Sequence, residues 1–366
     1  MILYHIMNKQ LKFPVKSAFF KTVRHRVDQY FKDTGKQKHA TPAMWFKVGF
    51  FLSTFIACYV LVISGALSAA AMLAVVFLLG MCKAFVGFNI CHDALHGALS
   101  ANKKINRLFG MLFNLLGASP YVWKISHNAV HHTFTNIPGH DDDLVVAPGL
   151  IRIEESDPVR KIQRYQHWYA YPLYGLASIS WLLRKDFVKM FRPRIGQTAV
   201  RHPLKEYIYL FVSKLTYCFL FLLIPLLVLN VKWWQLGIGF LVMHVAQGLT
   251  MGLVFQLAHV VENTAFPKPD SKGTMEESWA EHQMRTTANF AGQSRIVTFL
   301  LGGLNRQIEH HLFPGICHVH YKQLSIIVKH TAAEYGLPYI ENRTFCNALS
   351  SHYRLLKYFA TSEYRP

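Results

Sequence analysis

The sequence has few charged residues, and acidic residues are especially scarce. Asp, Glu, Lys and Arg make up 16% of the 366 residues, against roughly a quarter of an average soluble domain. Only 20 residues are acidic while 39 are Lys or Arg, so the formal net charge is +19. Because 52% of the residues are hydrophobic, the composition excludes an intrinsically disordered chain.

The sequence also lacks the patterns of a secreted or disulfide-bonded protein. Its six cysteines include no C-x-x-C pair, so we interpret them as small buried hydrophobic residues and expect no disulfide framework. The first 43 residues contain no apolar run long enough for a secretory signal peptide. There is also no internal repeat.

Basic residues are nearly absent from the longest apolar parts of the chain. Of the 39 Lys and Arg, 36 lie in three blocks, residues 1–47, 92–206 and 260–366. A nucleic-acid-binding protein concentrates its charge on a reading helix or stripe, whereas here the blocks flank apolar runs. We therefore expect no nucleic-acid partner.

Four apolar stretches are each about as long as the ~20 residues that cross a bilayer. Ser64-Gly65 separates the first two stretches and residues 230–232 separate the last two, so each pair is predicted to form a hairpin. Four spans return the chain to its starting side, and the positive-inside rule then places both termini and all three basic blocks in the cytoplasm. The predicted spans cover about 45–63, 67–90, 207–229 and 233–258.

These features predict an all-α, multi-pass membrane protein with four transmembrane helices in two hairpins and a cytoplasmic helical cap. Lys83 and Lys214 fall inside predicted spans, where we expect them to snorkel or to face the bundle interior. The main domain is predicted over 45–340, after an N-terminal segment 1–44 and before a C-terminal tail 341–366.

A helix is predicted within the N-terminal segment, beginning at Ser17. One of its faces carries Phe20, Val23, Val27 and Tyr30, and basic residues lie elsewhere. This pattern is typical of an amphipathic helix on an anionic membrane surface. We therefore expect an interfacial helix.

The sequence contains 20 histidines, and several of them are clustered at the spacing of one helical turn. Neutral imidazole is a good ligand for iron, zinc, copper and nickel. The clustered histidines exceed the number that one tetrahedral site holds, so they favour two metals or one crowded site. The three clusters, with Gln307 leading the last, are His92 and His96; His127, His131 and His132; and Gln307, His310 and His311.

Several histidines lie outside the three clusters. His259 directly follows the fourth predicted span on the side of the clusters, which makes it a further candidate ligand. His318 and His320 alternate along the chain, and for them an interfacial position is favoured over metal binding. The unclustered histidines are interpreted as structural, and ligand spacing alone suits zinc as well as iron.

The three clusters resemble the histidine boxes of the integral-membrane fatty acid desaturases. HDALH from His92 resembles the first box, HNAVHH from His127 the second, and QIEHHLFP from Gln307 the third. The glutamine at the start of the third box is similar to that of front-end desaturases, which act between an existing double bond and the carboxyl end. The resemblance covers roughly residues 45–340.

The resemblance implies an O2-dependent di-iron enzyme that introduces a cis double bond into an acyl-CoA or acyl-lipid. Gln307 stands where other branches of the family have a histidine. Asp93, Glu309 and Asp142 are candidates for orienting the imidazoles by accepting their free N–H groups. The ligands implied for the two irons are His92, His96, His127, His131, His132, His259, His310 and His311, with Gln307 as a weak ligand or a partner of a bound water.

The sequence departs from many front-end desaturases, which carry a fused cytochrome b5 domain. Only 44 residues precede the first predicted span, and no His-Pro-Gly-Gly haem motif occurs. We therefore expect a separate electron donor of the ferredoxin or cytochrome b5 type, attracted by the basic face. The bacterial inner membrane is favoured over the endoplasmic reticulum.

Two other functions remain open at the level of sequence. A fatty acyl or lipid hydroxylase on the same scaffold would share the boxes and differ only after the first hydrogen abstraction. A non-catalytic membrane metal-binding protein would place its ligands along a path inside the membrane. The predicted clusters lie outside the spans, which counts against this second alternative.

Overall fold

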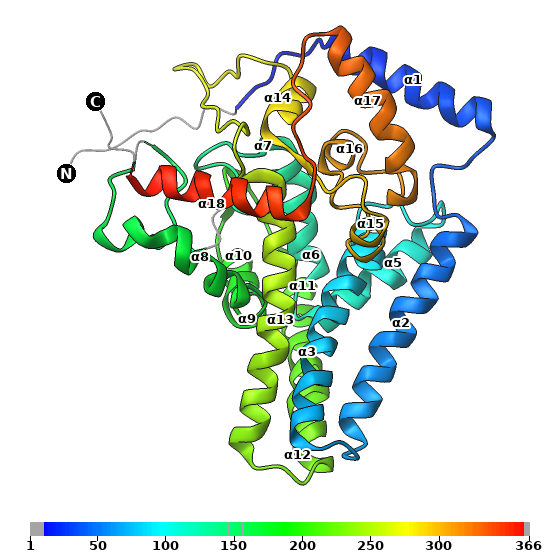
Figure 1. Cartoon of the computed structure of the whole chain (residues 1–366), viewed down its shortest axis with the longest axis vertical. Coiled ribbons are helices and arrows are strands. Elements are labelled where there is room, and N and C mark those ends of the chain that lie inside the picture. Colours follow the sequence, from blue (N-terminus) through cyan, green and yellow to red (C-terminus); the bar gives the residue numbers. More distant parts are fainter. Residues whose placement is uncertain (1–10, 145–146, 156, 362–366) are drawn as a thin grey trace.

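The computed structural model describes residues 11–144, 147–155 and 157–361. As predicted, the fold is mostly helical, and the four two-residue strands of the described residues form two small pairs (Figure 1). The α-helices are α1 Ala18–Thr34, α2 Pro42–Ile63, α3 Ala69–Val86, α4 His92–Leu95, α5 Lys103–Met111, α6 Pro120–Trp123, α7 His132–Phe134, α8 Gln166–Gly175, α9 Ala177–Ser180, α10 Asp186–Met190, α11 Leu204–Cys218, α12 Ile224–Val228, α13 Trp233–His259, α14 Trp279–Thr286, α15 Arg295–Leu300, α16 Gln307–Leu312, α17 Tyr321–Glu334 and α18 Phe345–Thr361.

Shorter helical segments and strands join these helices. The π-helical segments are η1 Gly87–Cys91, η3 Lys124–His131, η5 Trp181–Lys185 and η6 Phe219–Leu223, and the 3₁₀ segments are η2 Leu112–Leu116, η4 Lys161–Tyr165 and η7 His318–His320. Strand β1 Arg194–Ile195 pairs antiparallel with β2 Thr198–Ala199, and β3 Asn289–Phe290 pairs parallel with β4 Glu341–Asn342.

Four helical stretches of the described chain are long and apolar enough to cross a membrane, which confirms the predicted number of spans. They cover Pro42–Ile63, Ala69–Leu95, Leu204–Val228 and Trp233–His259. The second and fourth reach beyond the predicted ends at 90 and 258, so His92 and His259 belong to the last turns of spanning helices. The sequence had placed the clusters just outside the spans.

The spans form a bundle that protrudes from one end of the molecule, and the other elements form a cap at the opposite end (Figure 1). The bundle is held by close contact between α3 and α13. At Gly80, an added Cβ would overlap the carbonyl oxygen of Met243. Small residues at such a crossing let two helix backbones approach, which is the usual basis of helix association in membranes.

The two lysines within the spans face the bundle interior. Lys214 Nζ donates to the carbonyl of Gly117 and to Asp186 Oδ2, each at 2.6 Å. Asp186 Oδ2 also accepts from the backbone N–H of Ser119 at 2.7 Å. Lys83 is fully buried and donates to the hydroxyl of Tyr217. Lys214 therefore fastens the third span to the cap.

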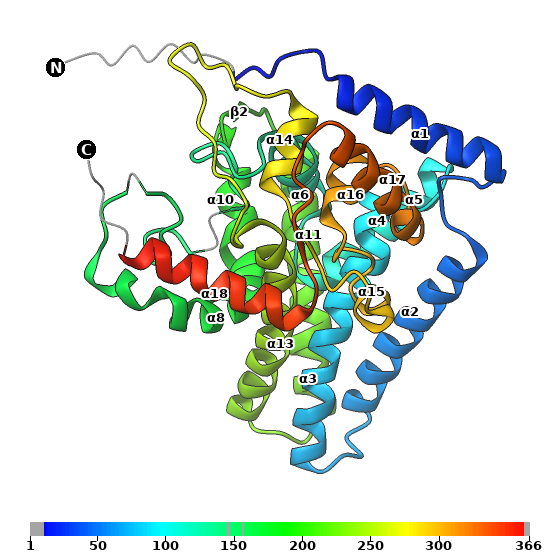
Figure 2. The ribbon, with the colours of Figure 1, turned by 45° about the horizontal axis from the view of Figure 1, so that its top comes forward.

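Helix α1 forms where it was predicted, but its apolar face is occupied by protein. Ser17 Oγ caps the helix by accepting from the N–H of Phe20 at 3.0 Å. Phe19, Val23 and Val27 are buried in a core that α14, α16 and α17 also form. The expectation that this face lies on a membrane is therefore wrong, and α1 covers the end of the cap farthest from the spans (Figures 1 and 2).

The segment predicted as a C-terminal tail is part of the packed cap. Helix α18 packs against α8 and α13. Its His352 makes two hydrogen bonds: Nε2 lies 2.9 Å from the hydroxyl oxygen of Tyr174, and Nδ1 lies 2.6 Å from the carbonyl oxygen of Val260. The predicted boundary at residue 340 therefore does not coincide with a break in packing.

Breaking the Lys214–Asp186 pair should destabilise the fold strongly, because both side chains are buried. We expect Asp186→Asn to lower the free energy of unfolding in detergent by about 3–5 kcal/mol, since it leaves an unpaired buried ammonium. The exposed pair of Asp28 and Lys38 supplies the control, and Asp28→Asn should change stability little. An Asp186→Asn protein as stable as the Asp28→Asn protein would contradict this account.

Candidate metal centre

The histidines of all three clusters meet where the spans enter the cap. The second span rises through η1 and α4 to carry His92 and His96, and α13 ends at His259. The segments η3 and α7 carry the second cluster, and α16 carries the third. Elements far apart in the sequence therefore deliver their imidazoles to one place, as the clustering predicted.

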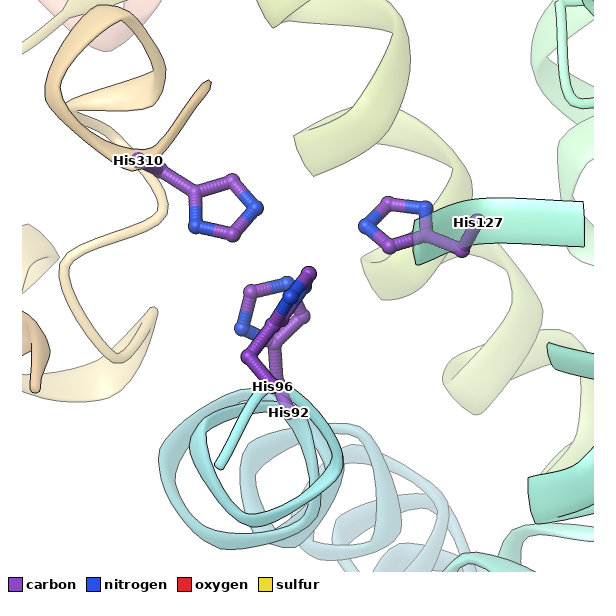
Figure 3. A group of neighbouring side chains, drawn as sticks. All are labelled: His92, His96, His127 and His310. Carbon is purple, nitrogen blue, oxygen red and sulfur yellow. The ribbon is translucent and has the colours of Figure 1, made fainter. Parts of the chain in front are cut away.

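Four of these histidines form a first group, made of His92, His96, His127 and His310. One ring nitrogen from each lies within 4.8 Å of the corresponding nitrogens of the others. Figure 3 shows His92 and His96 rising from one helix while His127 and His310 approach from either side, so that the rings are directed at a shared space. The arrangement could hold one metal ion.

A second group consists of His131, His259 and His311, whose ligand atoms also lie within 4.8 Å of one another. His132 lies between the two groups. Its ring centroid is 4.6 Å from that of His310 in the first group and 4.4 Å from that of His311 in the second. The described residues therefore offer two adjacent sites with one imidazole between them.

The two groups divide residues that are close in the sequence. His127 and His131 were expected to repeat the i, i+4 spacing of an α-helical pair, yet they belong to different groups. Their rings are nevertheless stacked neighbours, with centroids 5.0 Å apart, so the spacing brings them together while each faces a different group. Successive residues on α16 point in different directions, which likewise separates His310 from His311.

Most of these rings are held from behind through Nδ1. His131 Nδ1 lies 2.8 Å from Asp141 Oδ2, His310 Nδ1 lies 3.1 Å from the hydroxyl of Tyr321, and His311 Nδ1 lies 2.8 Å from Gln283 Oε1. His259 Nδ1 faces the carbonyl of Thr286 at 3.3 Å, and His127 Nδ1 lies 3.6 Å from Asp143 Oδ2. Such contacts fix the tautomer and the orientation of a metal-binding imidazole.

The opposite nitrogens have no such partner. Among the described residues, the buried Nε2 atoms of His96, His127, His131, His132, His259, His310 and His311 lack any hydrogen bond. A buried polar atom without a partner costs free energy, so a cluster of them in a native fold requires an explanation. Lone pairs that converge in this way fit metal ions, and the residues present therefore suit the predicted centre.

Burial also keeps these rings in the form that binds metal. Desolvation lowers the pKa of His127 to about 3, although the Asp143 carboxylate opposes the shift. Burial and neighbouring imidazoles hold the pKa of His132, His310 and His311 well below the usual value. A neutral imidazole has a free lone pair, which a metal requires.

The acidic residues that orient the imidazoles differ from those predicted. Asp142, which was a candidate, accepts from the backbone N–H of Gly196 at 2.9 Å and supports a turn. Its neighbours Asp141 and Asp143 contact the histidines instead. The run of three aspartates after the second box was the available signal, but the sequence does not show which of them points inward.

The other two candidates also have different partners. Glu309 accepts from Asn289 Nδ2 and from the hydroxyl of Tyr339, each at 2.8 Å, and burial raises its pKa to about 7. Asp93 lies 4.0 Å from His92 but only 2.8 Å from Nδ1 of His318. Glu309 therefore links α16 to Asn289 and Tyr339 within the cap, and Asp93 lies closer to His318 than to His92.

Asp93, Cys317 and His318 form a third group with ligand atoms within 4.8 Å of one another. Here, however, both ring nitrogens of His318 have partners, because Nε2 lies 2.9 Å from the ammonium of Lys47. A cation at this distance opposes a metal ion. His320, the other histidine of this motif, lies 3.1 Å through Nε2 from the carbonyl of His39. These contacts agree with the sequence-based preference against metal binding by both residues.

A cavity of about 140 Å³ opens beside the first group. His92, His127, His259 and Gln307 line it on one side. Most of the remaining wall is apolar and continues into the region of the spans, with Phe88, Phe113, Trp181, Met251 and Phe255 among its residues. Gln307 therefore borders the same cavity as the histidines, and an apolar ligand there would lie against them.

Comparison with known proteins identifies the family of this chain. The family model described as fatty acid desaturase matches residues 67–343. The chain belongs to the fatty acid desaturase family. It is therefore an oxidoreductase, and its four apolar helices and its histidine clusters fit a membrane desaturase that binds metal. Membership of this enzyme family contradicts the alternative of a non-catalytic membrane metal-binding protein.

Individual relatives are similar over nearly the whole desaturase chain. It is 35% identical to an acyl-lipid (8-3)-desaturase of Physcomitrium patens over 95% of this chain and 72% of the relative. It is 33% identical to an sn-1 linoleoyl-lipid 6-desaturase of a Synechocystis strain, over 95% and 97% of the two chains. A desaturase of the same name from Arthrospira platensis is also 33% identical, over 93% of this chain and 92% of the relative.

The contact of Asp141 with His131 leads to a test of the second group. We expect Asp141→Asn to weaken metal binding by about 10- to 100-fold, because the ring loses the acceptor that orients it. Asp142→Asn is the matched control, since among the described residues this neighbour accepts from the backbone of Gly196 and not from an imidazole, and it should bind metal like the wild type. Metal titration of purified protein measures both. Equal affinities in the two variants would contradict the assignment.

Proposed function

We propose that this desaturase is an O2-dependent di-iron enzyme that introduces a cis double bond into a lipid-linked acyl chain, at a front-end position. The observation that carries the proposal is the convergence of buried Nε2 atoms without hydrogen bonds in two adjacent groups. The proposed ligands are His92, His96, His127 and His310 for one iron and His131, His259 and His311 for the other, with His132 between them and Gln307 at the edge.

The chemistry of the substrate supports iron. Desaturation removes hydrogen from unactivated methylene groups, which no side-chain acid or base can do. Two irons would supply the activation of O2 that this step needs. Zinc fits the ligand spacing equally well, but it has no redox chemistry.

The chain itself supplies position and a dry environment. The apolar wall of the cavity, which includes Phe113 and Phe255, would hold an extended acyl chain beside the first group. The same wall keeps water away from the reacting carbon atoms. Because Nδ1 contacts hold the rings from behind, the ligand nitrogens are set before the substrate arrives, which reduces reorganisation during the reaction.

The relatives' names support the choice of substrate. Their names describe acyl-lipid or linoleoyl-lipid desaturases with numbered positions such as 6 and 8-3. The glutamine at the start of the third box is similar to that of front-end desaturases. We therefore favour an acyl-lipid over an acyl-CoA. A hydroxylase on the same scaffold remains the alternative that a product analysis must exclude.

We propose further that electrons come from a separate ferredoxin or cytochrome b5 type protein. The cap, with the described parts of the N- and C-terminal segments, would lie in the cytoplasm, because it holds nearly all basic residues. A bacterial inner membrane is favoured over the endoplasmic reticulum, and two of the relatives are from Synechocystis and Arthrospira.

The product tests this function most simply. Methyl esters from a host that expresses the enzyme should show a new cis-unsaturated acyl chain by gas chromatography with mass spectrometry. Replacing His131 or His310 with Ala should abolish the product and lower the iron content. His330→Ala is the control, because its ring is exposed and pairs with Glu334 on the same helix. A hydroxylated product, or full activity of both histidine variants, would overturn the proposal.

A further inference from the structure

A groove of about 550 Å³ lies between α1 and the start of α14. Lys21, Arg24 and His25 of α1 line one part of it, and Trp279 of α14 lines another. Both helices lie at the end of the cap away from the spans (Figures 1 and 2). The groove therefore opens toward the aqueous side and not toward the bilayer.

The rim of the groove is basic. Lys21 and Arg24 are exposed, and Lys16 flanks the groove on the same segment. Asp28 also lines the groove, but it pairs with Lys38 at 2.6 Å. One further carboxylate, that of Glu281, lies beside the groove, where it accepts from the hydroxyl of Ser17 at 3.2 Å and from the N–H of Ser278 at 3.1 Å. The groove therefore presents net positive charge to a partner.

Trp279, which lines the groove, is hydrogen-bonded to a residue of the candidate metal centre. The indole Nε1 of Trp279 donates to the carbonyl of His132 at 2.8 Å. The indole also packs edge-on against Phe20, with ring centroids 5.4 Å apart. The ring of His132 in turn contacts both histidine groups. The half-buried indole of Trp279 is therefore connected to the centre by one hydrogen bond and by the covalent bonds of His132.

The reaction needs such a route, and this step rests on the proposed function. One O2, two electrons and two protons convert –CH2–CH2– into –CH=CH– and two waters. The substrate supplies two of the four electrons that reduce O2, and a one-electron carrier protein must supply the other two in succession. Electron tunnelling weakens steeply with distance, so a buried centre needs a short path from the place where the carrier docks.

We propose that an acidic one-electron carrier protein docks in this groove and that its electrons enter through Trp279 and His132. Opposite charges accelerate the encounter of two proteins. Complexes of electron-transfer proteins are small, burying less than about 1,200 Å², so a groove with a few basic residues suffices. An anionic lipid surface is disfavoured because the groove faces away from the spans.

Charge reversal tests the docking surface. The holoenzyme is placed in phosphatidylcholine nanodiscs, and its affinity for an acidic plant-type ferredoxin and for cytochrome b5 is measured at low and high salt. Lys21→Glu with Arg24→Glu should weaken binding of the carrier that acts as donor by about tenfold or more at low salt, with a smaller difference at high salt.

The matched control reverses two other charges of the cap. Lys161→Glu with Arg164→Glu makes the same change in net charge on the exposed segment η4 before α8, and it should bind the carrier like the wild type. If both double variants bind the carrier as tightly as the wild type, the proposal is overturned. Binding lost equally in both would reduce the effect to overall charge and would also overturn it.

A substitution at Trp279 tests the route. Trp279→Phe keeps an aromatic ring against Phe20 but removes the N–H that bonds His132. We expect iron content close to wild type, while the rate of electron transfer within the preformed complex, measured at saturating carrier, falls several-fold. The ratio of carrier-driven to dithionite-driven desaturation should fall with it. An unchanged rate within the complex would overturn the route.

The two proposals fail in different ways. If dithionite supports desaturation but charge reversal leaves carrier binding unchanged, the groove is not the docking site and the proposed function stands. If neither a carrier nor dithionite yields an unsaturated product from the wild-type holoenzyme, the proposed function fails, and the docking proposal fails with it.

Discussion

The structure depends on burying a set of imidazoles whose inner nitrogens have no protein partner. Any one of them, such as His132 with two such nitrogens, would be unfavourable in an ordinary core. Their outer nitrogens are held by Asp141, Gln283 and Tyr321, which come from loops and helices far apart in the sequence. The cap is therefore built to present lone pairs to a common space, and metal ions are the ligands that such a space suits.

The same constraint explains why the centre lies at the junction of spans and cap. Spanning helices deliver His92 and His259 in their last turns, and cap elements deliver the remainder. The Lys214–Asp186 pair ties a span to the cap, which helps to keep the two parts in register. The centre borders an apolar cavity, and the indole of Trp279, which does not line that cavity, bonds the backbone carbonyl of His132. An acyl chain and an electron carrier can thus approach from different directions.

Much of this organisation could be predicted from the sequence, because long apolar runs and clustered histidines are local patterns. The four spans, the Ser17 cap of α1 and the gathering of the three clusters followed from such patterns. The division of His127 and His131 between two groups did not, because the i, i+4 spacing brings two rings side by side without showing which group each ring faces. The membrane face assigned to α1 was wrong because an amphipathic pattern does not distinguish lipid from the apolar surface of α17. Contacts such as Gln283 with His311 depend on the tertiary fold and had no local signal.

The central claim is that two metal ions occupy the two histidine groups, with His132 between them. Anomalous diffraction at the iron edge from crystals of the iron-loaded enzyme tests it most directly. The account predicts two peaks, one in bonding range of His92, His96, His127 and His310 and the other in bonding range of His131, His259 and His311. A single peak, or a peak beside Asp93 and His318, would contradict it.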